Sequence, residues 1–173
     1  MVTPMTRPDR IPVPAEFAAL PFGEQLILWA IRFWVKALQT EANAQTVLRA
    51  GFECARAPDA HPALDDLMTI ISISAQRSID IRCPKCPSIS PDEERLLGAV
   101  AAWQHGLPPA YADSFFSAWL PASALRVART PASQLAYALS HAGMMIRSRK
   151  PGRPETVRNQ PEDIEEGRTV TVH

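Results

Sequence analysis

A CxxC pair leads directly into a marked helix start in the stretch Cys83-Pro84-Lys85-Cys86-Pro87-Ser88-Ile89-Ser90-Pro91-Asp92-Glu93-Glu94. Ser90, Pro91 and Glu93 stand in the order of a capping box. In that motif the serine accepts from the helix backbone, proline takes the first helical position and the glutamate reaches back. Asp92 and Glu94 place negative charge at the positive end of the helix dipole. The sequence therefore predicts a helix that begins directly after a cysteine loop.

On both sides of this loop, apolar residues recur at three- and four-residue steps, which is typical of amphipathic helices. The pattern predicts helices over about 24–39, 41–56, 62–81, 91–105, 110–120, 122–128 and 131–148. Thr40 is the expected cap of the second, and Thr130-Pro131 the expected start of the last. The third is apolar nearly all round, which places it at the centre of a bundle. With no convincing strand pattern, the fold class is all-α, an orthogonal bundle of about six or seven helices.

The first predicted helix has one broad apolar face, with Arg32 and Lys36 on the opposite side. Trp29 and Trp34 point about 140° apart at ~100° per residue, so one of them should be partly exposed. An exposed aromatic is a reasonable contact for a partner protein or a second copy of the chain.

Both ends of the chain differ in composition from the helical part. Pro4, Pro8, Pro12 and Pro14 predict an extended, proline-rich N-terminal arm over residues 1–14. Residues 15–148 form the predicted helical domain. Residues 149–173 are polar and proline-rich and are predicted to be a disordered tail.

Composition bounds the function. The 173 residues suffice for one domain with a real core, and the 18 basic side chains balance 18 acidic ones. That balance argues against a whole-domain electrostatic grip on nucleic acid or on a membrane surface. Prolines interrupt the place of a signal peptide, and no apolar run approaches the ~18 residues of a membrane helix. We therefore expect a cytoplasmic protein whose three cysteines are reduced.

Cys83 and Cys86 leave four interpretations open. They are small apolar residues of a tight loop, or half of a zinc site shared across a dimer. Alternatively they belong to a zinc site completed by His141 or by a carboxylate such as Asp80, or they form a redox pair. A redox pair normally starts a helix, whose dipole lowers the thiol pKa, whereas here the helix cap is Ser90. Zinc is the only cofactor that the sequence indicates.

Helix lengths constrain the zinc alternatives. A helix over 62–81 is roughly 30 Å long at ~1.5 Å per residue, so it separates His61 from Cys83. Cys54 and His105 are carried to the same far end as His61. A site made of Cys54, His61, Cys83 and Cys86 is therefore not expected, and neither is a catalytic Cys–His pair, since His61 stands in a common helix-start context.

A basic cluster lies at residues 147–154, with Arg147, Arg149, Lys150 and Arg153 as candidate DNA-binding residues. Its Lys-Pro-Gly-Arg-Pro core looks like an AT-hook, a segment that lies in an A·T-rich minor groove. A solvated linker is the simpler interpretation, because acidic residues follow immediately.

We find no phosphate-binding glycine loop and no hydrolase or metalloprotease motif in the sequence, so an enzyme is unsupported. The first hypothesis is a non-enzymatic helical protein that binds another macromolecule, as a homodimer, with the CxxC loop as a structural or metal-binding element. The alternatives are a DNA-associated regulator using the basic tail, and a thiol-dependent enzyme or redox protein using Cys83 and Cys86.

Overall fold

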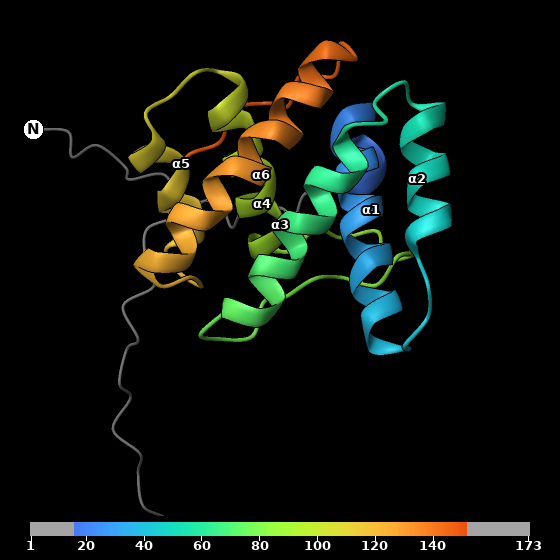
Figure 1. Cartoon of the computed structure of the whole chain (residues 1–173). Coiled ribbons are helices and arrows are strands. Elements are labelled where there is room, and N and C mark those ends of the chain that lie inside the picture. Colours follow the sequence, from blue (N-terminus) through green and yellow to red (C-terminus); the bar gives the residue numbers. More distant parts are fainter. Residues whose placement is uncertain (1–15, 152–173) are drawn as a thin grey trace, which may run out of the picture.

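A computed structural model describes residues 16–151, and this part of the chain is all-helical, as predicted (Figure 1). A short 3-10 helix, η1 (Phe17–Ala19), precedes six α-helices. These are α1 (Phe22–Gln39), α2 (Gln45–Cys54), α3 (Ala60–Ser74), α4 (Pro91–Gln104), α5 (Pro109–Phe116) and α6 (Ala122–His141). The predicted arm over residues 1–14 and most of the predicted tail lie outside the described residues.

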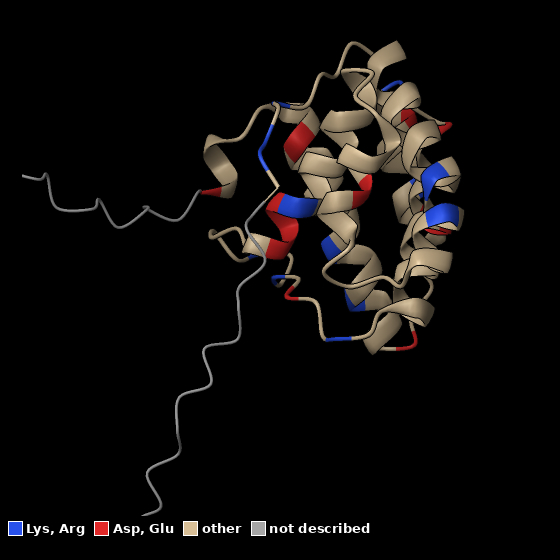
Figure 2. Ribbon diagram, turned by 90° about the vertical axis from the view of Figure 1, so that its left-hand side faces the viewer, with Lys and Arg blue, Asp and Glu red and all other residues tan. Residues whose placement is uncertain are grey.

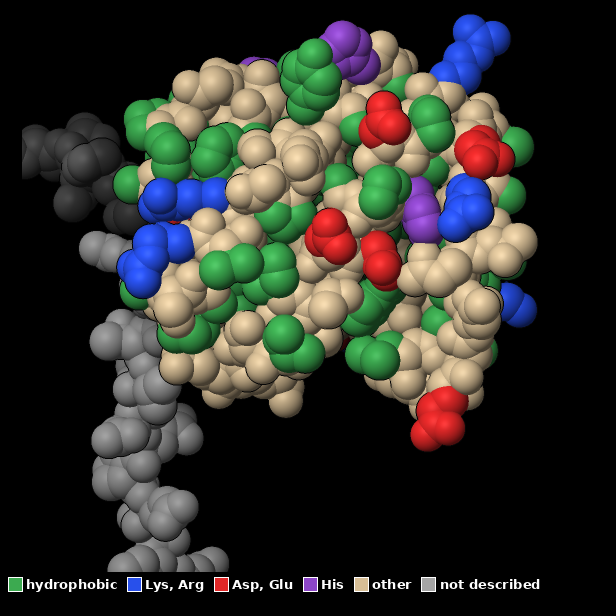
Figure 3. Space-filling model, in the orientation of Figure 1, with side chains coloured by type: hydrophobic (Ala, Val, Ile, Leu, Met, Phe, Trp, Pro, Cys, Tyr) green, Lys and Arg blue, Asp and Glu red, His purple; other side chains and the backbone are tan. Residues whose placement is uncertain are grey.

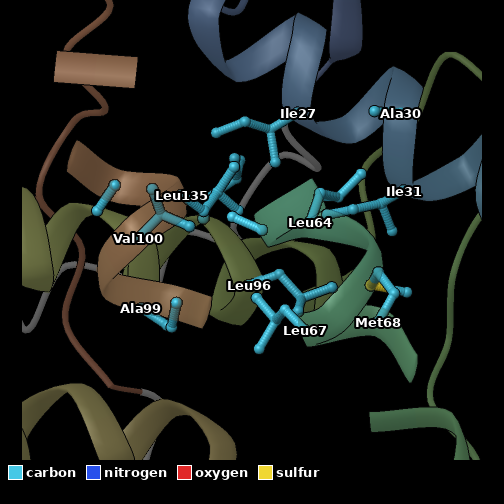
Figure 4. Packing of buried hydrophobic residues seen from close by; sticks show 14 of the residues in the cluster. Ile27, Ala30, Ile31, Leu64, Leu67, Met68, Leu96, Ala99, Val100 and Leu135 are labelled. Carbon is cyan, nitrogen blue, oxygen red and sulfur yellow. The ribbon is translucent and has the colours of Figure 1, made fainter. Parts of the chain in front are cut away.

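The helices pack as a bundle in which α3 and α6 lie side by side in front of α4, with α5 on one flank and α1 and α2 on the other (Figure 1). Figure 4 shows the centre of the core, where aliphatic side chains from four helices meet. The labelled residues are Ile27, Ala30 and Ile31 of α1; Leu64, Leu67 and Met68 of α3; Leu96, Ala99 and Val100 of α4; and Leu135 of α6. This contact joins the two flanks into one hydrophobic unit.

The predicted capping box at the start of α4 is confirmed. The Ser90 hydroxyl accepts from the Glu93 backbone N–H, and the Glu93 carboxylate accepts from the Ser90 N–H. The helix ends at Gln104, and Gly106 follows with φ of 64°, a left-handed conformation that favours glycine.

The third predicted helix is too long by seven residues. Helix α3 ends at Ser74, and residues 75–90 run without a helix up to α4. It also buries one face rather than its whole surface, since Ile73 is 78% exposed. Isoleucines of the predicted C-terminal turns, Ile79 and Ile81, instead pack against the core from the loop.

The predicted break at Pro131 is also wrong. One helix, α6, runs from Ala122 to His141 through the proline. Its buried stripe of Ala124, Ala128, Ala132 and Leu135 continues across that position at helical spacing. Packing of this stripe against α3 and α4 outweighs the backbone hydrogen bond that a proline removes. After His141, residues 142–143 form a turn and residues 144–150 run without a helix, where the prediction continued the helix to 148.

The start of α2 differs as well. Thr40 ends α1 and does not cap α2, because its N–H and hydroxyl both contact carbonyls of the last turn of α1. The Asn43 side chain accepts from the Gln45 N–H, where α2 begins. Among the described helices, none is both long and apolar enough to cross a membrane.

Candidate functional site at the disulfide loop

The connection between α3 and α4, residues 75–90, is the longest stretch without a helix between two described helices. Connections of this length in compact domains are usually functional or disordered. This one is held in place by a dense set of hydrogen bonds. We therefore take it, with the surfaces it borders, as the candidate functional site.

Arg32 of α1 holds the second half of the loop. Its side chain is fully buried and forms a two-pronged ion pair with Glu93, with 2.7 Å from Nε to Oε1 and 2.9 Å from Nη2 to Oε2. The same guanidinium donates to the Cys86 carbonyl at 2.7 Å and to the Ser88 carbonyl at 2.8 Å. Arg32, which the sequence places on the side opposite the apolar face of α1, is buried there because the cysteine loop covers that side.

The first half of the loop is held by Asp92. Its carboxylate accepts from Arg77, from the Asp80 backbone N–H and from the indole of Trp119. Burial alone would raise the pKa of Asp92, but the hydrogen bonds from Arg77 and Asp80 outweigh it and hold that pKa below its usual value. The carboxylate is therefore a charged anchor at neutral pH.

Next along the same helical turn, Glu94 pairs with Arg149. Arg149 and Arg147 also pair with Glu24 of α1, at 2.8 and 2.9 Å. Burial alone would raise the pKa of Glu24, but the hydrogen bonds from both arginines lower it to about 2. Figure 2 shows acidic and basic residues gathered where α4 begins, so its first turn ties together three separate segments of the chain.

These ion pairs bear on the predicted DNA-binding residues. Arg147 and Arg149 lie against the body of the protein and their charges face carboxylates, although Arg149 was assigned to the tail. Lys150 is exposed, and Arg153 lies outside the described residues. DNA binding by this cluster stays a prediction, and phosphate contacts by the two arginines would compete with Glu24 and Glu94.

Cys83 and Cys86 form a disulfide, in contrast to the reduced thiols expected from the sequence. The Cys86 N–H donates to the Cys83 carbonyl at 3.0 Å, which closes a tight turn. Cys83 is exposed and Cys86 is half-buried, and Lys85 between them is exposed. By a chain-entropy estimate, so small a ring stabilises the fold by only about 2 kcal/mol.

The residues proposed as further zinc ligands do not join this pair. Within residues 16–151, no three residues among His, Cys, Asp and Glu are grouped so as to hold a metal ion. His141 instead packs against Tyr137 with the rings tilted and their centroids 4.2 Å apart, and Cys54 is free and exposed. Zinc binding by Cys83 and Cys86 stays a prediction that requires the reduced pair and ligands from elsewhere.

His61 is buried at the start of α3, against Phe52 of α2. Its Nε2 has no hydrogen-bond partner among the described residues. Nearby, Arg56 has a φ of 58° and lines a cavity of about 380 Å³ with Tyr137 and His141. His61 is therefore part of the packing at the α2–α3 turn, whereas the exposed His141 borders the cavity beside it.

Beside the disulfide loop lies an apolar groove of about 430 Å³ between the C-terminal halves of α1 and α3. We call it the α1–α3 groove; its apolar lining is Trp34, Val35, Leu38, Met68, Ile71, Ala75, Ile79, Ile81 and Leu96. Figure 3 shows the surface hollowed between the lower ends of these helices, with hydrophobic side chains on both sides. Leu38 is 58% exposed there.

The two tryptophans of α1 lie as predicted, with Trp34 buried and Trp29 partly exposed and stacked on Phe33. Sequence reasoning missed Arg32 and Glu24, whose partners are 61 and 123 residues away. Their one local signal is a charged residue inside a strongly apolar helix.

Comparison of the chain with protein-family models, with curated proteins and with solved structures found no match.

Proposed function

We propose that the protein binds an apolar segment of another protein in the α1–α3 groove. The observation that carries this proposal is the groove itself, an open hollow of about 430 Å³ with a lining that is mostly aliphatic. Grooves of this kind beside helices receive amphipathic helices or extended peptides, whose apolar residues fill them. Binding of another macromolecule, by a homodimer, was the first hypothesis drawn from the sequence.

Several groove residues suit a protein ligand. Met68 is unbranched and adapts its shape to different neighbours. Leu38 is already exposed, so its burial on binding adds to the affinity at no cost to the fold. Arg77 also lines the groove with a side chain that is 43% exposed, and its charge favours a segment with acidic residues next to its apolar anchors.

The test is a selection of random peptides displayed on phage, followed by fluorescence polarisation with the selected peptides. We expect apolar anchors flanked by acidic residues. Leu38→Asp should weaken binding at least about tenfold, because it places a charge in an apolar contact. Val127→Asp on α6 is the matched control, since Val127 is 60% exposed against 58% for Leu38.

Three outcomes would contradict the proposal. One is a selection that enriches no peptide. Another is binding that Leu38→Asp leaves unchanged. The third is self-association of the chain that Leu38→Asp abolishes, which would make a second copy the occupant of the groove.

A further inference from the structure

We infer that the Cys83–Cys86 disulfide is a redox-active couple that exchanges with small anionic thiols, and that it is not a brace for the fold. The inference does not depend on the α1–α3 groove. It rests on how the loop is held, on the exposure of the two cysteines and on the charges next to them.

The loop is held without the sulfur atoms. Arg32 binds the carbonyls of Cys86 and Ser88, the Asp92 carboxylate accepts from the Asp80 N–H, and the Glu93 carboxylate accepts from the Arg82 N–H. The disulfide joins residues only three apart, and the Cys86 N–H already closes that turn on the Cys83 carbonyl. Opening the disulfide therefore removes none of these hydrogen bonds.

The two cysteines are unequally exposed. Cys83 is exposed while Cys86 is half-buried, so an incoming thiolate reaches Cys83 first. Lys85 is exposed between them, and the Arg32 guanidinium contacts the backbone of the loop from within the protein. The Arg32 charge is already paired with Glu93, so Lys85 is the cation that favours the approach of an anionic thiol and stabilises the thiolate that leaves.

The exchange is a two-electron reduction in two steps. A glutathione thiolate attacks the Cys83 sulfur, forms a mixed disulfide and releases Cys86 as a thiolate, which takes a proton from water. A second glutathione thiolate then attacks the glutathione sulfur of the mixed disulfide. Oxidised glutathione leaves and Cys83 is released as a thiolate, so two glutathione thiols are oxidised and the protein gains two thiols.

The experiment uses the whole chain with Cys54→Ser, because Cys54 is free and exposed and would form its own mixed disulfide. The protein is equilibrated with mixtures of reduced and oxidised glutathione, trapped by alkylation and analysed by mass spectrometry. We expect reversible opening of the disulfide in folded protein. The melting temperatures of the reduced and oxidised forms should differ by no more than about 6 °C.

Single-cysteine variants assign the attacked sulfur. With oxidised glutathione, Cys86→Ser should form a mixed disulfide at Cys83 several times faster than Cys83→Ser does at Cys86. Lys85→Glu should slow reduction of the intact pair at least about threefold at low salt, and added salt should diminish the difference. Arg49→Glu, the same charge change at an exposed position on α2, is the control.

The inference is overturned if the disulfide opens only when the protein unfolds, or if reduction itself unfolds the loop. It is also overturned if the reduced pair takes up zinc at half an ion per chain and resists reoxidation, since the cysteines would then serve a metal site shared by two copies. Equal reactivity of the two single-cysteine variants would remove the asymmetry on which the attack at Cys83 depends.

Discussion

The loop before α4 and the turn between α2 and α3 both redirect the chain between helices, but they treat buried polar groups differently. Before α4, the buried Arg32 and Glu93 pair with each other and with the loop backbone. At the α2–α3 turn, the His61 Nε2 is buried without a partner in the described part of the chain, and Arg56 has a positive φ. We therefore expect the loop before α4 to be rigid, and the α2–α3 turn to be a place where a substitution can increase stability.

The largest expected effect is the loss of Arg32. Arg32→Met leaves the Glu93 carboxylate buried without its ion pair and frees two loop carbonyls, so we expect a loss of about 3–5 kcal/mol of stability. Urea unfolding measures it. Arg49→Met, on the surface of α2, should change stability by less than about 0.5 kcal/mol. A loss no larger than that of the control would show that the pair does not hold the loop.

A smaller effect is expected in acid. The folded-state pKa of Glu24 is about 2, below its ordinary value of 4.5, so its contribution is fully present above pH 4.5 and is lost as the pH falls towards 2. We expect the ionised Glu24 to contribute about 2 kcal/mol to the free energy of unfolding. This is less than the full pKa shift implies, because the Arg147 side chain is 57% exposed and solvent screens the pair. Asp92 acts in the same direction.

The measurement is urea unfolding of wild type and Glu24→Gln at a series of pH values. The variant should be less stable at pH 7, and the difference should shrink towards zero near pH 2. A difference that is constant with pH would mean that the charge of Glu24 is not what binds Arg147 and Arg149.

The smallest effect is expected at the α2–α3 turn, where the substitution should increase stability instead of lowering it. His61→Leu removes a buried nitrogen that has no described partner and keeps an apolar side chain against Phe52, so we expect a gain of about 1 kcal/mol. Thermal unfolding measures it. His141→Leu is the control, because His141 is exposed. Destabilisation by His61→Leu would reveal a partner for the imidazole and remove the contrast between the two ends.

Local signals predicted much of this fold. The Ser90–Glu93 capping box and the turn at Gly106 depend on residues within a few positions of each other, and both were predicted. Helix periodicity gave the class of fold for the same reason. Pro131 was misread because the local rule for proline competes with burial of a stripe on α6, which depends on other helices.

The candidate site was only half predictable. Cys83 and Cys86 stand out in the sequence, but nothing near them indicates Arg32, which is 51 residues from the nearer of the two. The pattern of α1 placed Arg32 opposite the apolar face, and only the return of the chain over that side buries it. The groove depends in turn on the early end of α3, after which the chain presents Ile79 and Ile81.

The pairing of Glu24 with Arg147 has a consequence for synthesis of the protein. Translation produces Glu24 first, and its partner follows 123 residues later. Until then a chain still on the ribosome cannot bury the Glu24 carboxylate without an uncompensated charge. Docking of the segment after α6 onto the start of α1 is therefore a closing step that waits until all the described helices have been made.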